Sequence, residues 1–268
     1  MPSEDEWQAL LDDVDPPGPL QAEVFIKKLP GFSKSVLLTC HDGEEYAVKG
    51  QQRRAGRYHR TLIADQVIGR LGAAMGAPVG ETVLVDVPQE LIVAEPDLQH
   101  LEPGLAHACR WIPNCSEKAT KFRESKENRE RFARLAILYG LAGGHDQQVI
   151  YENQTPNLAH SVDHGHFLPP GAGQWTEESL RNRTDFEADP KILTSLSFSD
   201  SELQDAAALL EQITSEEIAE AVATVPTEWG ITDAERVAVA DYFHRAKQGL
   251  LEEYGTEAPK EAEEADNE

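Results

Sequence analysis

Basic residues, cysteine and long apolar runs are all scarce in this sequence of 268 residues. Lysine and arginine number 24 against 48 aspartates and glutamates, which gives a formal net charge of −24 at pH 7. A surface this acidic repels nucleic-acid phosphates and anionic membranes. The charge balance therefore argues against a nucleic-acid partner or a membrane-surface role, and it says nothing about catalysis.

The few cysteines and the missing apolar runs bear on the cellular compartment. Cys40, Cys109 and Cys115 are an odd number, and none of them forms a closely spaced pair of the kind that binds metal. This usage is typical of a reducing cytosol. No apolar run approaches the ~20 residues that cross a bilayer. The acidic start, MPSEDEWQALLDDVD, lacks the basic region of a secretory signal. We therefore expect a cytoplasmic protein without a membrane partner.

What the sequence does contain, from Glu23 onward, is a run of strand-like segments with tight turns. Glu23–Leu29 and Val36–Cys40 predict two strands, and Asp42-Gly43 predicts a hairpin turn into a third strand that ends at Lys49. In the small lobe of a kinase, the N–H groups of such a first turn approach nucleotide phosphates, and a strand lysine pairs with them. The turn residues that can add hydroxyl and ammonium contacts here are Ser33, Lys34 and Ser35.

Beyond Lys49 the pattern changes mostly to helices. Apolar residues at helical spacing predict a helix that carries Asp65 and stops at Gly76. Capping boxes such as Thr214-x-x-Glu217 predict later helices. The predicted elements are, in order, a helix over about 58–75, strands over Glu81–Val87 and Glu90–Ala94, an irregular stretch over His100–Cys115, a helix over Arg129–Leu141, and helices from Trp175 to about Tyr254.

Residues 143–167, GGHDQQVIYENQTPNLAHSVDHGHF, hold two aspartates on either side of a predicted hairpin. Asp146 precedes the strand Gln147–Tyr151, and Asp163 follows the strand Asn157–Val162. Two acids at neighbouring strand ends can hold a divalent metal and orient a nucleophile, which is what phosphoryl transfer needs. Four of the nine histidines lie in the same window. A hydrolytic site with Zn²⁺ or Mn²⁺ is therefore an alternative on these residues.

Four segments, DGEEYAVKG, LGAAMGAPVGE, LAGGHDQQVIY and SVDHGHF, occur in an order that resembles the HipA-like kinases. These are relatives of the phosphatidylinositol-kinase branch of the protein-kinase-like fold, and the resemblance is closest to their compact bacterial branch. It implies an α+β, bilobal protein-kinase-like fold with a small β-rich N-lobe and a larger, mostly helical C-lobe. The expected units are an acidic appendage and linker (1–22), the N-lobe (23–95), the C-lobe with the catalytic and metal loops (96–254), and a disordered acidic tail (255–268).

The resemblance also implies roles for single residues, with ATP and Mg²⁺ as cofactors. Asp146 would orient a hydroxyl on an unidentified protein or small molecule, as in a serine/threonine kinase. Asp163 would hold Mg²⁺, Lys49 would pair with the phosphates, and Asp65 would replace the usual helix glutamate. The nucleotide would also contact the turn Gly31–Ser35, and Leu91–Glu95, including Glu95 itself, would cradle its adenine. Glu95-Pro96 would be the crossover between the lobes.

The catalytic loop departs from the family pattern, which commonly reads Asp-Arg with an asparagine five residues after the aspartate as second metal ligand. Here Gln147 follows Asp146, and Tyr151 occupies the fifth position. Asn153, two residues later, is the predicted second metal ligand, with Gln148 or His164 as substitutes. The departure keeps a second alternative open, a pseudokinase that binds nucleotide or a partner with weak or no turnover.

Overall fold

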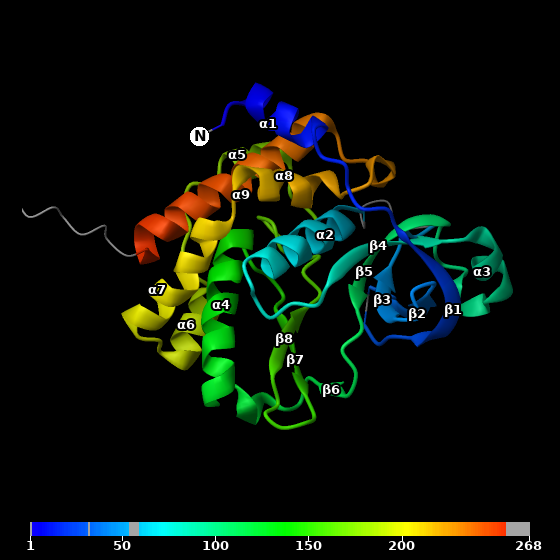
Figure 1. Cartoon of the computed structure of the whole chain (residues 1–268), viewed down its shortest axis with the longest axis horizontal. Coiled ribbons are helices and arrows are strands. Elements are labelled where there is room, and N and C mark those ends of the chain that lie inside the picture. Colours follow the sequence, from blue (N-terminus) through cyan, green and yellow to red (C-terminus); the bar gives the residue numbers. More distant parts are fainter. Residues whose placement is uncertain (1, 32, 54–58, 256–268) are drawn as a thin grey trace, which may run out of the picture.

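The computed structural model describes residues 2–31, 33–53 and 59–255. The predicted disordered tail lies outside the described residues from position 256 onward, as does Phe32 of the Gly31–Ser35 turn. In Figure 1 a strand-rich part lies to the right and a helical part to the left, with α2 (His59–Ala74) between them. This mixture of sheets and helices agrees with the predicted α+β class.

The strand-rich part is a closed barrel with the strand order β1-β2-β3-β5-β4. All neighbours pair antiparallel except β1 and β4, which run parallel over a short contact that closes the barrel. Alternate side chains, such as Val36, Leu38, Tyr46 and Val48, point into its core and are buried. The barrel strands are β1 (Leu20–Lys28), β2 (Val36–Cys40), β3 (Glu45–Lys49), β4 (Thr82–Val87) and β5 (Gly104–Arg110).

Two sequence predictions for the barrel are wrong. The segment predicted as the strand Glu90–Ala94 is a short helix, α3 (Gln89–Ala94), followed by a 3₁₀ turn at Pro96–Leu98. A short apolar run does not distinguish a strand from a helix, and here only Ile92 of the helix is buried. The stretch predicted as irregular contains β5, whose alanines and histidine gave a weak strand signal but which pairs with both β3 and β4.

The predicted unit boundary at residue 95 stays a prediction, although it falls inside the barrel because β5 completes the sheet. The chain leaves the barrel only after Arg110. A boundary after β5 therefore fits the strand pairing better than one before it.

Most of the remaining chain forms the helical part, which has its own hydrophobic core. The capping box predicted at Thr214 is formed, and Thr232 forms another at the start of α9. The N-terminal helix, α1 (Glu4–Asp12), packs on α8 and α9 through the buried Trp7. The other helices are α4 (Lys126–Ala142), α5 (Glu177–Arg181), α6 (Pro190–Leu196), α7 (Asp200–Ala208), α8 (Ser215–Ala223) and α9 (Asp233–Tyr254).

A small second sheet places the two predicted aspartates. Its strands are β6 (Cys115–Ser116), β7 (Gln148–Glu152) and β8 (Ala159–Val162), and β7 pairs antiparallel with β8 so that Gln148 faces Val162. Asp146 precedes β7 and Asp163 follows β8, so both lie at the same end of this hairpin. A backbone bridge between Val79 and Ser161 joins the hairpin to the loop that precedes β4.

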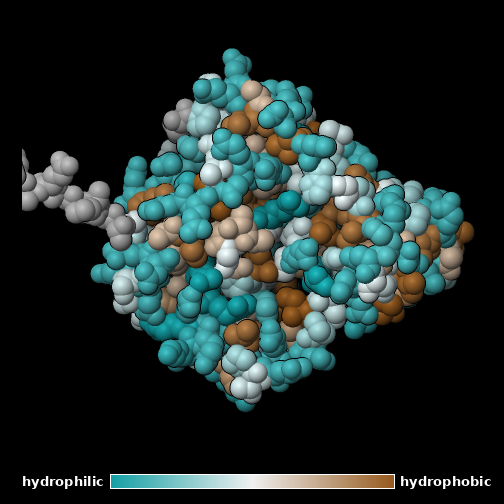
Figure 2. Space-filling model, in the orientation of Figure 1, coloured by the Kyte–Doolittle hydropathy of each residue, from teal (hydrophilic) through white to brown (hydrophobic). Residues whose placement is uncertain are grey.

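The molecular surface reflects the composition. On the face shown in Figure 2 most residues are hydrophilic, in keeping with the net charge of −24. Among the helices of the described residues, none has both the length and the apolar character needed to cross a membrane.

Candidate functional site

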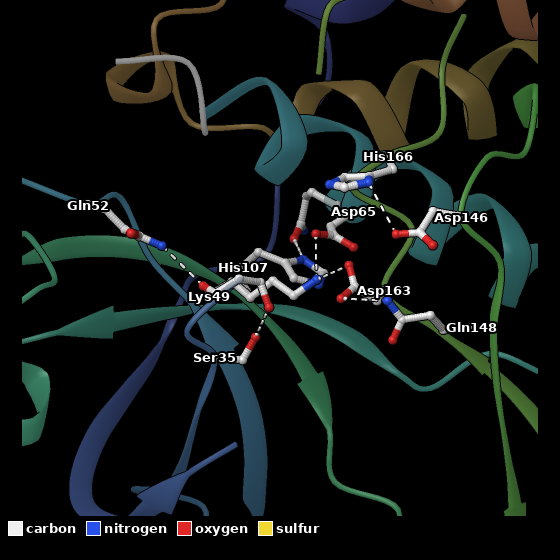
Figure 3. A network of polar contacts seen from close by, with 11 residues as sticks. Ser35, Lys49, Gln52, Asp65, His107, Asp146, Gln148, Asp163 and His166 are labelled. Carbon is white, nitrogen blue, oxygen red and sulfur yellow. Dashed lines mark hydrogen bonds and ion pairs between the residues drawn. The ribbon is translucent and has the colours of Figure 1, made fainter. Parts of the chain in front are cut away.

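Three charged side chains from distant parts of the sequence meet between the barrel and the helical part (Figure 3). Lys49 is the last residue of β3, Asp65 lies in α2, and Asp163 directly follows β8. The Lys49 Nζ atom is 2.9 Å from Asp65 Oδ2 and 2.6 Å from Asp163 Oδ1. One ammonium group therefore bridges two carboxylates, and the predicted Lys49–Asp65 pair is present although aspartate is one carbon shorter than glutamate.

The cluster is mostly shielded from water. The side chains of Asp65, Lys49 and Asp163 are 2%, 13% and 26% exposed. Burial opposes the charge of the ammonium, but the two carboxylates outweigh it and the pKa of Lys49 is raised. Burial also opposes the Asp65 carboxylate, but the neighbouring Lys49 prevails and the pKa of Asp65 is lowered. Lys49 and Asp65 are thus both charged at pH 7, and Asp163 lies at the more exposed side of the cluster.

The chain after Asp163 approaches α2 so closely that only glycine fits. Asp163 has a φ of 61°, a left-handed conformation that aspartate tolerates better than most residues. Two residues later, a Cβ atom at Gly165 would lie 2.8 Å from Asp65 Oδ2 and 3.1 Å from the backbone oxygen of Thr61. The Asp-His-Gly sequence therefore turns the chain sharply and places the Asp163 carboxylate beside α2.

Two buried histidines surround the cluster without joining it as ion-pair partners. His107 of β5 pairs with Lys49 in the sheet, and its Nδ1–H donates to Gln66 Oε1 at 2.9 Å. The His164 Nε2 atom is 2.8 Å from Ser161 Oγ. Burial is the main cause that lowers the pKa of each ring to about 4, so both histidines are neutral at pH 7.

Asp146 occupies a very different environment at the same end of the hairpin. Its Oδ2 atom is 3.3 Å from His166 Nδ1, and the two side chains are 64% and 46% exposed. Like Asp163, Asp146 has a positive φ, of 52°. The preceding α4 ends at Gly143 in the left-handed conformation, which releases the chain into this loop. Asp146 is therefore open to solvent and to a substrate.

The residues proposed as second metal ligands fall in different places. Asn153 follows the last residue of β7, at the end of the hairpin opposite to Asp163, so the prediction that it shares a metal with Asp163 is wrong. Tyr151 is buried against Phe132. His164 is occupied by Ser161. Gln148 is the substitute that reaches the site, because its Nε2 atom donates to Asp163 Oδ2 at 3.3 Å.

The donor set fits a hard cation that is completed by phosphates and water. Asp163 and Gln148 offer carboxylate and amide oxygens, the ligand type that Mg²⁺ prefers, and Mg²⁺ usually takes only one or two protein carboxylates. Across residues 2–31, 33–53 and 59–255 no three or more His, Cys, Asp and Glu side chains are grouped so that they could hold a metal ion. A zinc site typically needs three or four such ligands, so the hydrolase alternative has no ligand set in this part of the chain.

The predicted nucleotide contacts outside the cluster divide into two groups. The Ser33 Oγ and Ser35 Oγ atoms are 2.9 Å apart, and the Ser33 and Lys34 carbonyls accept hydrogen bonds from Gln52 and His100. The side chains of Gln52, after β3, and His100, before β5, therefore hold the backbone of this turn in place. Glu95 ends α3, which Figure 1 shows at the outer end of the barrel, away from β7 and β8. Glu95-Pro96, predicted as the crossover between lobes, lies between β4 and β5 of the same barrel, so the chain does not leave the barrel there. The prediction that Leu91–Glu95 cradles the adenine stays a prediction.

Three neighbours of the cluster were missed from the sequence. His107 and Gln66 form a buried polar pair beside Lys49, and Gly165 is the close-approach glycine. A strand assignment for residues 104–110 would have placed His107 opposite Lys49. The contact between Gly165 and Asp65 joins residues a hundred positions apart, and no local pattern encodes it.

The family model for HipA-like kinases matches residues 22–139. This confirms the resemblance over a segment that includes Lys49 and Asp65 and ends before Asp146. No curated protein matches the sequence significantly.

Solved structures extend the comparison to the rest of the chain. The crystal structure of the Helicobacter pylori proinflammatory kinase CtkA has a TM-score of 0.59 and 11% identity, covering 90% of this chain and 100% of that chain. At this identity the likeness shows a kinase-like fold and nothing finer. Two structures of the Golgi casein kinase, one with Mn and ADP bound, reach a TM-score of 0.44 and 12% identity, covering 94% of this chain and 77% of theirs.

Proposed function

We propose that this protein is an ATP- and Mg²⁺-dependent serine/threonine-type kinase with a bilobal arrangement, acting in the cytoplasm on a hydroxyl of a protein or small molecule. The observation that carries the proposal is the Lys49 ammonium bridging Asp65 and Asp163. A kinase needs a strand lysine that pairs with a helix acid and also faces the metal-binding aspartate. A hydrolytic metal site has no need for such a lysine.

The surroundings of each residue in the site support the role that we propose for it. Asp163 and Gln148 would hold Mg²⁺, which when bound neutralises charge on the nucleotide phosphates. Lys49, anchored by the buried Asp65, would then pair with the phosphates instead of Asp163. The exposed Asp146 would orient the acceptor hydroxyl and accept its proton while the hydroxyl oxygen bonds to the γ-phosphorus. The bond from that phosphorus to the β–γ bridging oxygen breaks, and ADP leaves.

The strand pairing supports a different position for the proposed crossover between lobes. The segment 111–114 links β5 of the barrel to β6 of the second sheet. We propose that this link, rather than Glu95-Pro96, joins the lobes and lies beside the adenine. Its backbone is held at Trp111, whose N–H donates to the Glu45 oxygen at 2.8 Å.

The direct test measures MgATP binding and transfer of labelled γ-phosphate by the purified protein. Wild type should melt at a higher temperature with MgATP and should label itself, a generic protein acceptor or a small hydroxyl compound. Asp163→Asn should reduce transfer by at least about 10²-fold. Asparagine accepts a positive φ, so this change removes the charge without straining the backbone. The matched control is Asp205→Asn, because Asp205 is exposed on α7; this variant should transfer like wild type. A wild type that neither binds MgATP nor transfers label contradicts the proposal.

One observation favours a second function, nucleotide binding without turnover. The position of the usual second metal ligand is taken by the buried Tyr151, and Asn153 lies at the far end of the hairpin. In this case MgATP would still raise the melting temperature, but no label would be transferred to any acceptor. Transfer by wild type that Asp163→Asn abolishes would rule out this function.

A further inference from the structure

The first turn of α2 is held in place by the segment that follows Asp163. This segment, residues 165–175, runs along α2 with two glycines against it. A Cβ atom at Gly173, which has a φ of 66°, would lie 2.9 Å from Thr61 Cγ2 and 3.6 Å from Arg60 Cβ. Gly165 makes the corresponding approach to Thr61 and Asp65. The segment and the helix therefore touch at two points. Gly173 lies against Arg60 and Thr61, and Gly165 lies against Thr61 and Asp65.

Arg60 of α2 and Trp175 of the segment hold the two together at one end of this contact. The Arg60 guanidinium carbon lies 4.4 Å from the centroid of the Trp175 ring. The pair is also joined by two reciprocal hydrogen bonds, because Arg60 Nη1 donates to the Trp175 oxygen and Trp175 Nε1 donates to the Arg60 oxygen, each at 3.2 Å. The Trp175 side chain is fully buried. The Arg60 side chain is 27% exposed, so the stacking on Trp175 and the hydrogen bonds in both directions, and not full burial, limit the freedom of the two residues.

The helix α9 also binds the Arg60 side chain. The Arg60 Nη2 atom forms an ion pair with Glu235 Oε1 at the start of α9. The Glu235 Oε2 atom accepts the Thr232 N–H at 3.0 Å in the capping box of that helix. Glu235 is thus fixed by the end of a 22-residue helix, and its carboxylate gives Arg60 a permanent partner.

The segment carries no residue that a kinase could modify on a hydroxyl. Residues 165–175 read GHFLPPGAGQW, without serine, threonine or tyrosine. In many kinases a phosphate on this part of the chain pairs with arginine, orders the segment and sets the helix that carries the lysine-binding acid. Here Arg60 already pairs with the resident Glu235 carboxylate. The arrangement that a phosphate creates elsewhere is therefore built into the packing.

We infer that Arg60 and Trp175 are positioning residues that hold α2 so that Asp65 stays on Lys49, without phosphorylation of the 165–175 segment. The inference rests on the proposed kinase function for its catalytic consequence. Five residues of helix, about 7.5 Å, separate Arg60 from Asp65, so a shift of the first turn moves the carboxylate. A misplacement of about 1 Å at a catalytic group can reduce the rate about 10²-fold.

A double-mutant cycle separates positioning from general stability. Arg60→Ala should lower kcat about 10- to 100-fold and change KM for ATP less, whereas in an Asp65→Asn background the same change should have little further effect. Arg60→Lys, which keeps the charge for Glu235, should recover part of kcat. The matched control is Arg245→Ala, because Arg245 lies over Phe186 at 5.9 Å and pairs with Asp241 at 2.8 Å, away from α2. Its effect should be small and equal in both backgrounds. Equal losses for Arg60→Ala in both backgrounds would overturn the inference.

A measurement without nucleotide keeps the two proposals apart. Hydrogen exchange of the amides at 61–66 should be faster in Arg60→Ala and in Trp175→Phe than in wild type, while Arg245→Ala should leave it unchanged. Trp175→Phe keeps a buried ring but loses the Nε1–H donor. If wild type transfers no phosphate, the kinase proposal fails. The exchange rates still decide whether the contacts of Arg60 and Trp175 hold α2 in place. Exchange at 61–66 that is the same in all four proteins would contradict the inference that Arg60 and Trp175 hold α2 in place.

Discussion

The two predicted aspartates lie at the same end of one hairpin, yet their surroundings are opposite. Asp163 belongs to a cluster in which the Lys49 ammonium lies 2.6 Å from its carboxylate and 2.9 Å from that of the buried Asp65. Asp146 Oδ2 lies 3.3 Å from His166 Nδ1, and most of the Asp146 side chain is exposed to solvent. Both aspartates share a left-handed backbone, so the difference comes from what packs on them.

This difference matches what the two halves of a phosphoryl transfer demand. Groups that bind a nucleotide and its metal act best when they are fixed beforehand in a site of low dielectric constant. A group that orients an acceptor must stay accessible until the acceptor arrives. The comparison therefore predicts that changes in the Asp163 cluster cost both stability and activity, whereas changes at Asp146 cost activity alone.

The largest expected effect on stability comes from Lys49→Met. The change leaves Asp65 charged, buried and without its ammonium partner, and breaking a buried ion pair costs about 3–5 kcal/mol. We expect the free energy of unfolding, measured with urea, to fall by this amount and phosphate transfer to be lost.

The double variant Lys49→Met/Asp65→Leu removes the stranded carboxylate as well. It should regain most of the lost stability because a well-packed apolar pair can replace a buried ion pair at little cost. It should stay inactive, which separates folding from function. A fall of less than about 1 kcal/mol in Lys49→Met would mean that the cluster behaves like a surface pair.

A smaller effect concerns His107 and pH. Burial, the main cause, lowers the pKa of the folded ring from 6.5 to about 4. Between these values the unfolded chain binds a proton that the folded chain does not, so the stability contribution is complete above pH 6.5 and is lost as the pH falls toward 4. At pH 5 the loss is about 2 kcal/mol.

The matched variant is His107→Asn, whose amide can still donate to Gln66 Oε1. In urea unfolding, the free energy of unfolding of wild type should be lower at pH 5.0 than at pH 7.5. In the variant this drop should be smaller by about 2 kcal/mol. Equal drops in both proteins would show that the ring is protonated as easily in the folded chain as in the unfolded one.

The sequence predicted the parts of this site that local patterns encode. Lys49 ends a strand after an Asp-Gly hairpin turn, and Asp163 follows a strand two residues before Gly165, so the element and the residue could be predicted together. The strand β5 was not predicted because its three buried residues, two alanines and a histidine, are consecutive and show no period-two alternation.

Contacts between distant segments could not be read in the same way. Gln148 reaches Asp163 only because the hairpin register sets Gln148 opposite Val162. The same register carries Asn153 to the other end, although asparagine is the residue that the family resemblance favours. A one-residue change of register would turn each side chain to the other face, and the sequence alone did not fix that register.

The smallest expected effect on stability comes from Asp146→Asn, and it tests the exposed half of the comparison. Asparagine tolerates the left-handed backbone at this position, and an exposed substitution away from packing changes the free energy of unfolding by less than about 0.5 kcal/mol. MgATP should raise the melting temperature of the variant as much as that of wild type, because the nucleotide side of the site is intact, while phosphate transfer should fall by at least about 10²-fold. A loss of stability near that of Lys49→Met would show that the contact with His166 is structural. Asp146 would then be a second buried-type anchor, and the division of labour between the two aspartates would not hold.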